Sequence, residues 1–392
     1  MRSHAFNPDA LIIVSEHFYP SSGATAQLIK NLADYLHHSG LPLVILTSTP
    51  GDSSGPYPIY RFCSTSSNSS SILSKLFNGI SFFAGALNWL LINSRSTNTL
   101  FIVSNPPFIG VLGLIINYIK RSHYLFLLQD LFPRSATLTG ILPSRGPLPL
   151  FWKIITKIVL TNSASTIVLS ESMKRRCQVE YDVVSNLHVI HNWPVFADPG
   201  PLNIITEEHS TLVIQYSGNF GRLHDILTLL EAARLLKDEP IQFVFIGGGA
   251  KYEQITRYKE EYQMLNIEVY PYISIEELPQ SIASCDISVV SLIPGAEDTV
   301  APSKLYGILA SSRPVLLIAS EDCELARSVK LSGSGFVFNP GDSLSIADKL
   351  KFLLHHKSHI ALAGSNAYLL YLNQYRPEHS LNQYSTLIRQ TS

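Results

Sequence analysis

The 392-residue sequence is poor in cysteine, in charge and in long apolar runs. Its four cysteines are far apart and form neither a CxxC pair nor a ligand pair with histidine, which argues against zinc and against a disulfide framework: Cys63, Cys177, Cys285 and Cys323. No stretch supplies the ~20 apolar residues that a membrane span needs. The start has an apolar core of only Ala10 to Val14 before Glu16, which predicts a buried strand and no signal peptide. A reducing compartment is the plain inference.

The composition and length predict two domains. With 46% hydrophobic and 15% charged residues, the chain has ample material for buried cores. Its length exceeds one ordinary core and suits two domains of roughly 150–200 residues each. We place the first at residues 1–195 and the second at 196–370, with a helical tail at 371–392; Pro194, Pro199 and Pro201 mark the linker.

The net charge of −1 conceals a split between the two halves. Residues 1–195 hold 14 Lys and Arg against 8 Asp and Glu, or +6, and the remainder holds 15 against 22, or −7. Between Asp52 and Glu171, nine basic residues accompany one acid, Asp130. This asymmetry predicts an anionic partner, either a membrane surface or a phosphorylated substrate, whereas nucleic acid is the weaker interpretation. Scattered solvated charge is the alternative.

Strands alternate with helical segments along the whole chain, which predicts parallel sheets covered on both faces. The strands are expected at Leu11–Ser15, Leu43–Thr47, Ile59–Phe62, Thr99–Val103, Tyr124–Leu128, Thr166–Ser170 and Leu187–Ile190, and then at Leu212–Tyr216, Phe243–Ile246, Ile267–Tyr270, Ile287–Ser291, Val315–Ile318 and Gly335–Phe338. The first β–α turn lacks GxGxxG, so a dinucleotide site is a poor interpretation. Ile72–Asn93 is an aromatic and aliphatic helical region that Asn78, Gly79 and Asn88 are expected to break. Buried packing is the more frequent explanation of such a region, and an apolar face in the membrane interface is the alternative.

The segment Glu297–Ser320 predicts a phosphate site. A polar loop runs into Pro302, Ser303 and Lys304, followed by a short apolar helix and a β-branched strand. Pro302 suits the first helical turn, where its missing N–H costs nothing. A hydroxyl and an ammonium beside the unpaired N–H groups of that turn favour an anion. An ordinary surface lysine is the alternative.

Asp130 follows the strand Tyr124–Leu128, where open α/β sheets bind their ligands. An acid alone among nine cations at such a strand end is a candidate catalytic residue. The alternatives are a helix N-cap or an ion pair with Arg134.

Several of these segments together resemble one family. PSK with an apolar helix and a Pro-led strand, NPPF at residues 105–108, QDLFP at 129–133 and HNWP at 191–194 are similar to segments of the family-4 retaining glycosyltransferases. The likeness is to the branch that builds bacterial cell-surface polysaccharides, such as colanic acid and O-antigen. It implies the GT-B fold, two Rossmann-like domains facing across a cleft, with a C-terminal helix crossing back to the first domain.

The resemblance also assigns roles to individual residues. Lys304 and Arg222 would stabilise a departing diphosphate, and Asp130 would orient or deprotonate the acceptor. Donor-binding positions would be Gly23, Gly218, Asn219, His224, Gly248, Ile275, Glu297, Pro302 and Ser303. No metal site and no cofactor are expected, because a nucleotide-diphosphate sugar is the co-substrate and basic side chains replace a divalent cation.

The chain departs from the family pattern in three places. The family's usual Arg and Lys align with Asn219 and His224, so Arg222 would be the substitute cation. An arginine on a solvated loop is the alternative. The E-x7-E pair that holds the donor sugar and ribose aligns with Thr299 and Gly307; only Glu297 and Asp298 lie near. In the family, the turn after the first strand reads GGA; in this chain Ser22 stands at the position of the first Gly, and Gly23 and Ala24 match. Donor sugar, base and linkage stay open.

The predicted function is transfer of a sugar from a nucleotide diphosphate donor to a lipid-linked glycan at the cytoplasmic face of the membrane. The alternatives are a GT-B nucleotide-sugar epimerase and a catalytically silent sugar-nucleotide-binding protein. Peripheral attachment is expected from the cations and the aromatic segment Leu76–Leu91, with Phe82, Phe83 and Trp89 inserting at the interface.

Overall fold

The computed structural model describes residues 7, 9–62, 72–183, 185–201 and 211–391. Cys63 lies outside the described residues. The chain forms two compact units, the first from residues 1–137, 142–191 and 378–392, and the second from residues 138–141 and 192–377. The second unit therefore begins at Asn192, before the predicted boundary, and the end of the tail belongs to the first.

The first domain is built on a seven-stranded parallel sheet in the order β3-β2-β1-β4-β5-β6-β7. Its strands are β1 (Leu11–Val14), β2 (Leu43–Thr47), β3 (Ile59–Arg61), β4 (Leu100–Val103), β5 (Tyr124–Leu128), β6 (Ser165–Val168) and β7 (Leu187–Val189). Strand order reverses between β1 and β4, so the carboxyl ends of these two strands flank the place where such sheets bind ligands.

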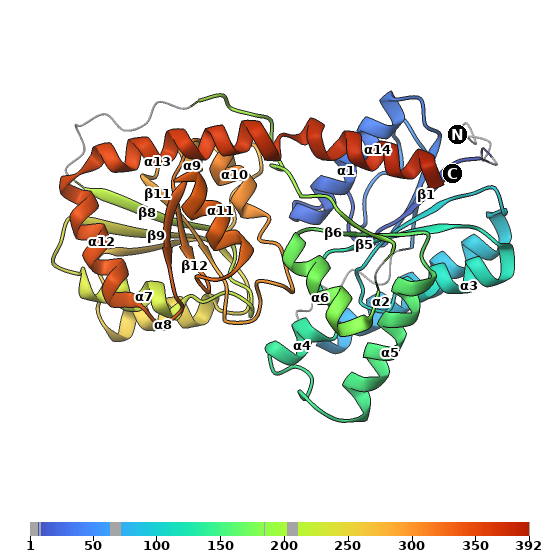
Figure 1. Cartoon of the computed structure of the whole chain (residues 1–392), viewed down its shortest axis with the longest axis horizontal. Coiled ribbons are helices and arrows are strands. Elements are labelled where there is room, and N and C mark those ends of the chain that lie inside the picture. Colours follow the sequence, from blue (N-terminus) through green and yellow to red (C-terminus); the bar gives the residue numbers. More distant parts are fainter. Residues whose placement is uncertain (1–6, 8, 63–71, 184, 202–210, 392) are drawn as a thin grey trace. The chain divides into compact units, whose positions relative to one another are not determined.

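Helices cover both faces of this sheet, as Figure 1 shows. They are α1 (Ala24–His38), α2 (Ile72–Asn93), α3 (Gly110–Lys120), α4 (Arg134–Leu138), α5 (Pro147–Asn162), α6 (Glu171–Tyr181) and α14 (Pro377–Thr391). Residues of α2, α3, α5 and α6 share one hydrophobic core with the sheet face carrying Ile12 and Ile102. On the opposite face, the Phe101 ring meets Tyr384 of α14 with centroids 5.9 Å apart.

Helix α2 corrects two expectations. It runs unbroken from Ile72 to Asn93. Gly79 lies within the helix and lets the Phe108 ring pack close to its backbone, since a Cβ on Gly79 would lie 3.2 Å from that ring. Its inward side is buried, with Phe82 at 0% and Trp89 at 9% exposure, so their predicted insertion into a membrane is wrong. Phe83 is half-buried against Phe108.

The same helix has the composition of a membrane span. Within the part of the chain that the structure describes, Leu76–Asn93 is the one segment long and apolar enough to cross a membrane, which the sequence was expected to lack. Because Phe82, Ala86 and Leu90 lie in the core of the sheet, α2 is a core helix with an apolar outer side.

The second domain repeats the architecture with a six-stranded parallel sheet in the order β10-β9-β8-β11-β12-β13. Its strands are β8 (Leu212–Asn219), β9 (Ile241–Gly248), β10 (Ile267–Tyr270), β11 (Ile287–Ser291), β12 (Val315–Ile318) and β13 (Gly335–Phe338). The helices are α7 (Leu227–Leu235), α8 (Tyr252–Glu261), α9 (Leu278–Ala283), α10 (Lys304–Ala310), α11 (Glu324–Ser332), α12 (Ser343–His355) and α13 (Lys357–Leu370).

Two cores sandwich this second sheet. Helices α7, α8 and α12 pack on one face around Phe243 and Leu316, and α10, α11 and α13 pack on the other around Val290 and Leu317. Strand order reverses between β8 and β11, which places the carboxyl ends of these strands at the expected ligand edge.

The C-terminal segment returns to the first domain, as predicted. A π-helical turn, η1 (Tyr371–Tyr375), precedes α14. Three hydrogen bonds hold α14 there: Ser380 Oγ to His191 O at 2.7 Å, Tyr35 Oη to Asn382 Oδ1 at 2.5 Å, and Arg389 Nη2 to Ser39 O at 2.9 Å.

Candidate functional site

Lys304 opens α10 at the carboxyl edge of the second sheet. Ser303 is the N-cap residue and makes no side-chain hydrogen bond to the helix. Pro302 lies one residue before the cap, so its predicted place in the first helical turn is wrong; instead its carbonyl accepts the Leu305 N–H at 3.1 Å. The turn thus delivers the Lys304 side chain to the sheet edge without using the Ser303 hydroxyl.

The Lys304 ammonium is buried without a counter-ion. Its Nζ has no hydrogen-bond partner and stands 3.6 Å from the centroid of the Tyr216 ring. A Cβ on Gly218 would lie 3.8 Å from the same nitrogen. Burial lowers the pKa of Lys304 well below its ordinary value. A cation held only by a ring face, with no acid beside it, is stabilised by an incoming anion.

His224 is a neutral neighbour of this cation. Its Nδ1 lies 2.7 Å from the Tyr216 hydroxyl, and its carbonyl accepts a hydrogen bond from Lys251. Burial, and then the Lys304 ammonium, lower the pKa of His224 to about 3. At neutral pH this histidine therefore orients Tyr216 and carries no charge for a diphosphate.

Gly218 and Gly248, two of the predicted donor-binding positions, lie at the ends of paired strands. β8 continues to Asn219 and β9 to Gly248, beyond their predicted ends, because Gly218 pairs with Gly247 and Asn219 with Gly248. Gly247 has φ 141°, and a Cβ on it would lie 2.0 Å from Gly218 O. Close packing of the strands therefore requires this glycine, whatever the ligand.

Arg222 and Ile275 are further predicted site residues of this domain. Arg222 is exposed on the β8–α7 turn, and no contact among the described residues joins it to Lys304. Ile275 is half-buried in a turn closed by Ser274 and Glu277, whose side chains accept each other's backbone N–H at 3.3 and 3.1 Å. These reciprocal hydrogen bonds are those of a capping box, which satisfies the turn without a ligand.

The structure also explains the missing carboxylate pair. Thr299 is fully buried, and a Cβ on Gly307 would lie 3.0 Å from the Phe196 ring, which occupies the space a longer side chain would need. The nearby Glu297 is engaged elsewhere, since its Oε1 accepts the N–H and the hydroxyl of Ser320 at 3.0 and 2.6 Å. One oxygen of Glu297 is left for a ligand.

Tyr272 was missed by the sequence analysis. Its ring is 61% exposed just after β10, and its hydroxyl donates to Gly248 O at 3.1 Å. A Cβ on Gly248 would lie 3.0 Å from this ring. An exposed aromatic face fixed beside the glycine turns is suited to stacking against a base. An aromatic residue after a strand is too common a signal to single out.

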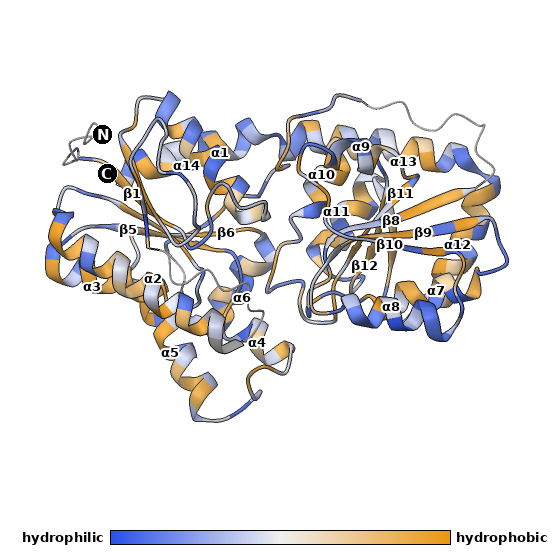
Figure 2. Cartoon of the chain, turned by 180° about the vertical axis from the view of Figure 1, so that it is seen from behind, coloured by the Kyte–Doolittle hydropathy of each residue, from blue (hydrophilic) through white to orange (hydrophobic). Residues whose placement is uncertain are grey.

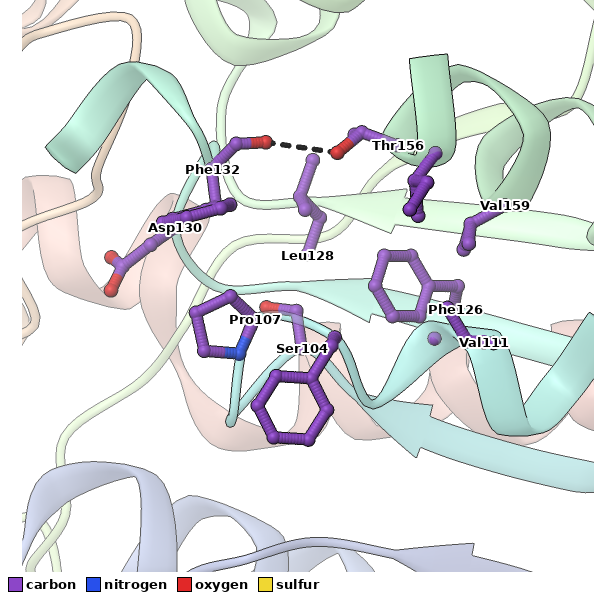
Figure 3. Close-up of a pocket in the computed structure, with 12 residues that line it drawn as sticks. Ser104, Pro107, Val111, Phe126, Leu128, Asp130, Phe132, Thr156 and Val159 are labelled. Carbon is purple, nitrogen blue, oxygen red and sulfur yellow. Dashed lines mark hydrogen bonds between the residues drawn. The ribbon is translucent and has the colours of Figure 1, made fainter. Parts of the chain in front are cut away.

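In the first domain, Asp130 stands beside a pocket at the end of β5 (Figure 3). The carboxylate is exposed, and Figure 3 shows it pointing away from Phe126 and Val159 at the apolar end of the pocket. Desolvation by surrounding protein raises its pKa to about 6. The carboxylate does not cap α4, because that helix begins only at Arg134. Among the described residues it makes no ion pair with Arg134.

Glu16 is a second acidic group at this edge that the sequence analysis passed over. It follows β1 at the point where strand order reverses. Its main-chain carbonyl accepts hydrogen bonds from the hydroxyls of Thr47, Ser48 and Thr49 at 3.0 to 3.2 Å. The side chain is 13% exposed and lies 3.8 Å from His17 Nε2, and burial raises its pKa to about 7.

The predicted residues therefore fall into two groups. Gly218, Asn219, His224, Gly248 and Lys304 gather at the second sheet. Asp130 and Gly23, the N-cap of α1, lie in the first domain, where Glu16 adds an acid that was not predicted. No cluster of three or more potential metal ligands occurs among the residues described. The second domain offers cationic and aromatic groups, and the first domain offers carboxylates.

Comparison with known proteins adds a family match to this geometry. Residues 203–369 match the family described as Glycosyl transferases group 1. The probable glycosyltransferase WbjE of Pseudomonas aeruginosa is 25% identical over 251 residues, which are 62% of this chain and 63% of WbjE. The match thus spans a little less than two thirds of that relative's length.

Solved structures share the fold along almost the whole chain. Sucrose-phosphate synthase from Thermosynechococcus elongatus superposes with a TM-score of 0.78 at 16% identity, covering 97% of this chain and 98% of that one. WaaG, a glycosyltransferase involved in lipopolysaccharide biosynthesis, gives 0.68 at 12% identity, covering 96% and 99%. HepE of Anabaena in complex with UDP-glucose gives 0.66 at 13% identity, covering 97% and 98%.

Proposed function

We propose that this chain, which has the GT-B fold and a second domain of the glycosyl transferases group 1 family, is a retaining glycosyltransferase. It transfers a hexose-type sugar from a nucleotide diphosphate donor to a hydroxyl of a lipid-linked glycan in cell-surface polysaccharide biosynthesis. The similar fold of WaaG, which acts in lipopolysaccharide biosynthesis, and of HepE, which binds UDP-glucose, supports the pathway class and the donor class.

The observation that carries the proposal is the unpaired ammonium of Lys304. A buried cation with no acid beside it is costly unless an anion completes it. The diphosphate of a nucleotide sugar supplies that anion, and Gly218 leaves room for it next to Nζ. When the bond between the anomeric carbon and the diphosphate oxygen breaks, the negative charge on the leaving group grows, and a fixed cation stabilises it.

Other residues of the second domain complete the donor site. Tyr272 presents its exposed ring to the nucleobase, and the free oxygen of Glu297 accepts a hydroxyl of the donor. Ser303 keeps its hydroxyl available, since the helix does not use it. The reaction needs no cofactor beyond the nucleotide sugar, because Lys304 supplies the charge that a divalent cation gives elsewhere.

The carboxylates of the first domain serve the acceptor. Asp130 is accessible, has no partner among the described residues and has a pKa near 6, so it is mostly ionised at neutral pH and accepts a hydrogen bond or a proton from a sugar hydroxyl. Glu16, whose main-chain carbonyl is hydrogen-bonded to Thr47, lies at the same sheet edge, and its carboxyl group offers a second hydrogen-bonding group to that sugar. The enzyme works at the cytoplasmic face of the membrane, where lipid-linked acceptors present their glycans.

A panel of nucleotide sugars tests the function. The full chain is incubated with UDP-, GDP-, ADP- and dTDP-sugars, with and without an extract of lipid-linked glycans. A transferase releases nucleoside diphosphate only when the acceptor extract is present. A new sugar isomer on the nucleotide would instead identify an epimerase, and binding without turnover under both conditions would identify a silent binding protein.

A further inference from the structure

Helix α5 of the first domain exposes an apolar side to solvent. Five of its sixteen residues are large hydrophobics that are 44–58% exposed: Leu148, Leu150, Phe151, Ile154 and Ile158. Leu150, Ile154 and Ile158 are spaced by four residues and therefore line one side of the helix, with Phe151 beside them. Together these five residues form what we call the α5 apolar face, and Figure 2 shows the hydrophobic colour along α5.

The outward direction of this face is fixed by the opposite side of the helix. Val159 and Leu160 are buried in the core of the first sheet, and the Trp152 ring packs edge-on against Phe132 with centroids 5.2 Å apart. Thr156 Oγ1 donates to Phe132 O at 3.1 Å. Because both ends of the inner side are anchored, α5 cannot turn its apolar face into the core without breaking these contacts.

The charged residues of α5 itself are all basic. The helix contains no Asp or Glu, and Lys153 and Lys157 follow each other along the edge of the apolar face. Arg145 is exposed just before the helix, and residues 53–170 hold nine basic residues and a single acid, Asp130. Asp182 lies 3.7 Å from Lys157, but both side chains are at least half exposed, so water screens the pair.

We propose that the α5 apolar face docks the first domain onto an anionic lipid bilayer, with its hydrophobic residues in the interface and Lys153 and Lys157 at the lipid headgroups. A helix with an apolar side edged by lysines is the type that lies in the plane of a membrane surface. A second copy of the chain fits less well, because pairing two such faces brings lysines against lysines.

The position of α5 links docking to the proposed reaction. Ile155, Thr156 and Val159, on its inner side, line the pocket beside Asp130. The helix that meets the bilayer is therefore also a wall of the acceptor region in the same domain. This inference deepens the proposed function and rests on it for its purpose, since a lipid-linked acceptor is presented at the membrane surface.

Vesicle sedimentation of the full chain tests the docking face. The probes are vesicles of phosphatidylcholine alone or with about one third phosphatidylglycerol, at low and high salt. The wild type binds the anionic vesicles, and salt weakens this binding without abolishing it. Leu150→Ser/Phe151→Ser/Ile154→Ser lowers the binding at least tenfold, and Lys153→Gln/Lys157→Gln lowers it at low salt only.

Two matched variants control for lost surface hydrophobicity. Leu265→Ser/Leu331→Ser changes residues of the second domain that are 94% and 88% exposed, and vesicle binding should not change. Phe77→Ser/Ile80→Ser removes two hydrophobic side chains that are 60% and 52% exposed on the outer side of α2, and vesicle binding should again not change. All variants are first shown to melt like the wild type and to bind nucleoside diphosphates equally.

Three results overturn the proposal. The first is that the wild-type protein does not bind anionic vesicles at low salt. The second is a loss of binding in the α2 variant while the α5 variant binds normally. The third is an α5 variant that turns a dimer into a monomer in sedimentation velocity without weaker vesicle binding, which would make the face a contact between copies. Since vesicle binding uses no substrate, a failed nucleotide-sugar panel leaves this result standing.

Discussion

The two domains share one strand order but differ in where they keep their charge. In the second domain a lysine is buried at the sheet edge without an acid, against the face of the Tyr216 ring. In the first domain the acids Glu16 and Asp130 occupy the same edge, and the cations lie in the acid-poor stretch that includes α5. We therefore propose that the same scaffold holds an anion site in the second domain and a hydroxyl site in the first, because the chemistry resides in the groups that follow the strands.

The largest expected effect concerns which residues of the first domain are structural. Phe82→Ala should lower the free energy of unfolding by about 3–5 kcal/mol, because it empties a fully buried site between α2 and the sheet. Phe77→Ala, in the same helix but 60% exposed, should change it by less than about 0.5 kcal/mol. Urea unfolding measures both. Equal losses would mean that α2 is not oriented as described.

The pH dependence of stability tests the acidic edge of the first domain. Because burial raises the pKa of Glu16 from 4.5 to about 7, the folded state holds this proton longer than the unfolded state. Stability is therefore highest below pH 4.5 for this group, falls between 4.5 and about 7, and stays low above, by up to about 3 kcal/mol. Glu16→Gln should remove this decline in urea titrations at several pH values. A decline that persists in the variant would place its origin in another group.

Asp130→Asn tests whether the first domain acts on the acceptor. We expect turnover to fall roughly 10²-fold, because a proton acceptor is lost, with donor affinity by calorimetry unchanged. The rate of the wild type should rise with pH through about 6, and the variant should lack this rise. Asp182→Asn, an exposed acid of the same domain, is the control. Weaker donor binding in Asp130→Asn would move the residue into the donor site.

Lys304→Met tests the anion site of the second domain while keeping the side-chain length. A charge-assisted contact is worth roughly 1.5–3 kcal/mol, so affinity for a nucleoside diphosphate should fall about 10- to 150-fold and affinity for the nucleoside should not. Because diphosphate binding favours the protonated amine, it should take up a proton, and affinity should fall as pH rises through the lowered pKa of Lys304.

Calorimetry in buffers of different ionisation enthalpy measures that proton. Lys330→Met, an exposed lysine of the same domain, should leave both affinities unchanged. Equal losses for nucleoside and diphosphate in Lys304→Met would contradict the assignment.

The smallest expected effect is that of Arg222→Ala. The side chain is exposed, and an exposed charge contributes less than about 1 kcal/mol, so diphosphate affinity should fall less than about fivefold. The predicted role of Arg222 as the substitute cation stays a prediction. A loss as large as that of Lys304→Met would show that the β8–α7 turn brings Arg222 onto the diphosphate.

The sequence by itself determined the strands and their alternation with helices. Apolar runs between turn residues predicted every strand of both sheets, because a buried parallel strand must be largely apolar. It also marked Asp130 and Lys304, since an isolated acid and a PSK turn are local signals.

The tertiary structure decided which side of each element is used. Phe82 and Phe77 stand in one apolar helix, and only the sheet beneath α2 separates a core residue from an exposed one. The same holds for α5, whose apolar face depends on Phe132 and the sheet fixing its other side. The Phe196 ring, which lies 3.0 Å from where a Cβ on Gly307 would be, leaves little room for a longer side chain at that position. The raised pKa of Glu16 depends on its burial in the fold. Burial depends on residues distant in the sequence, so the charge state of these groups is a property of the fold.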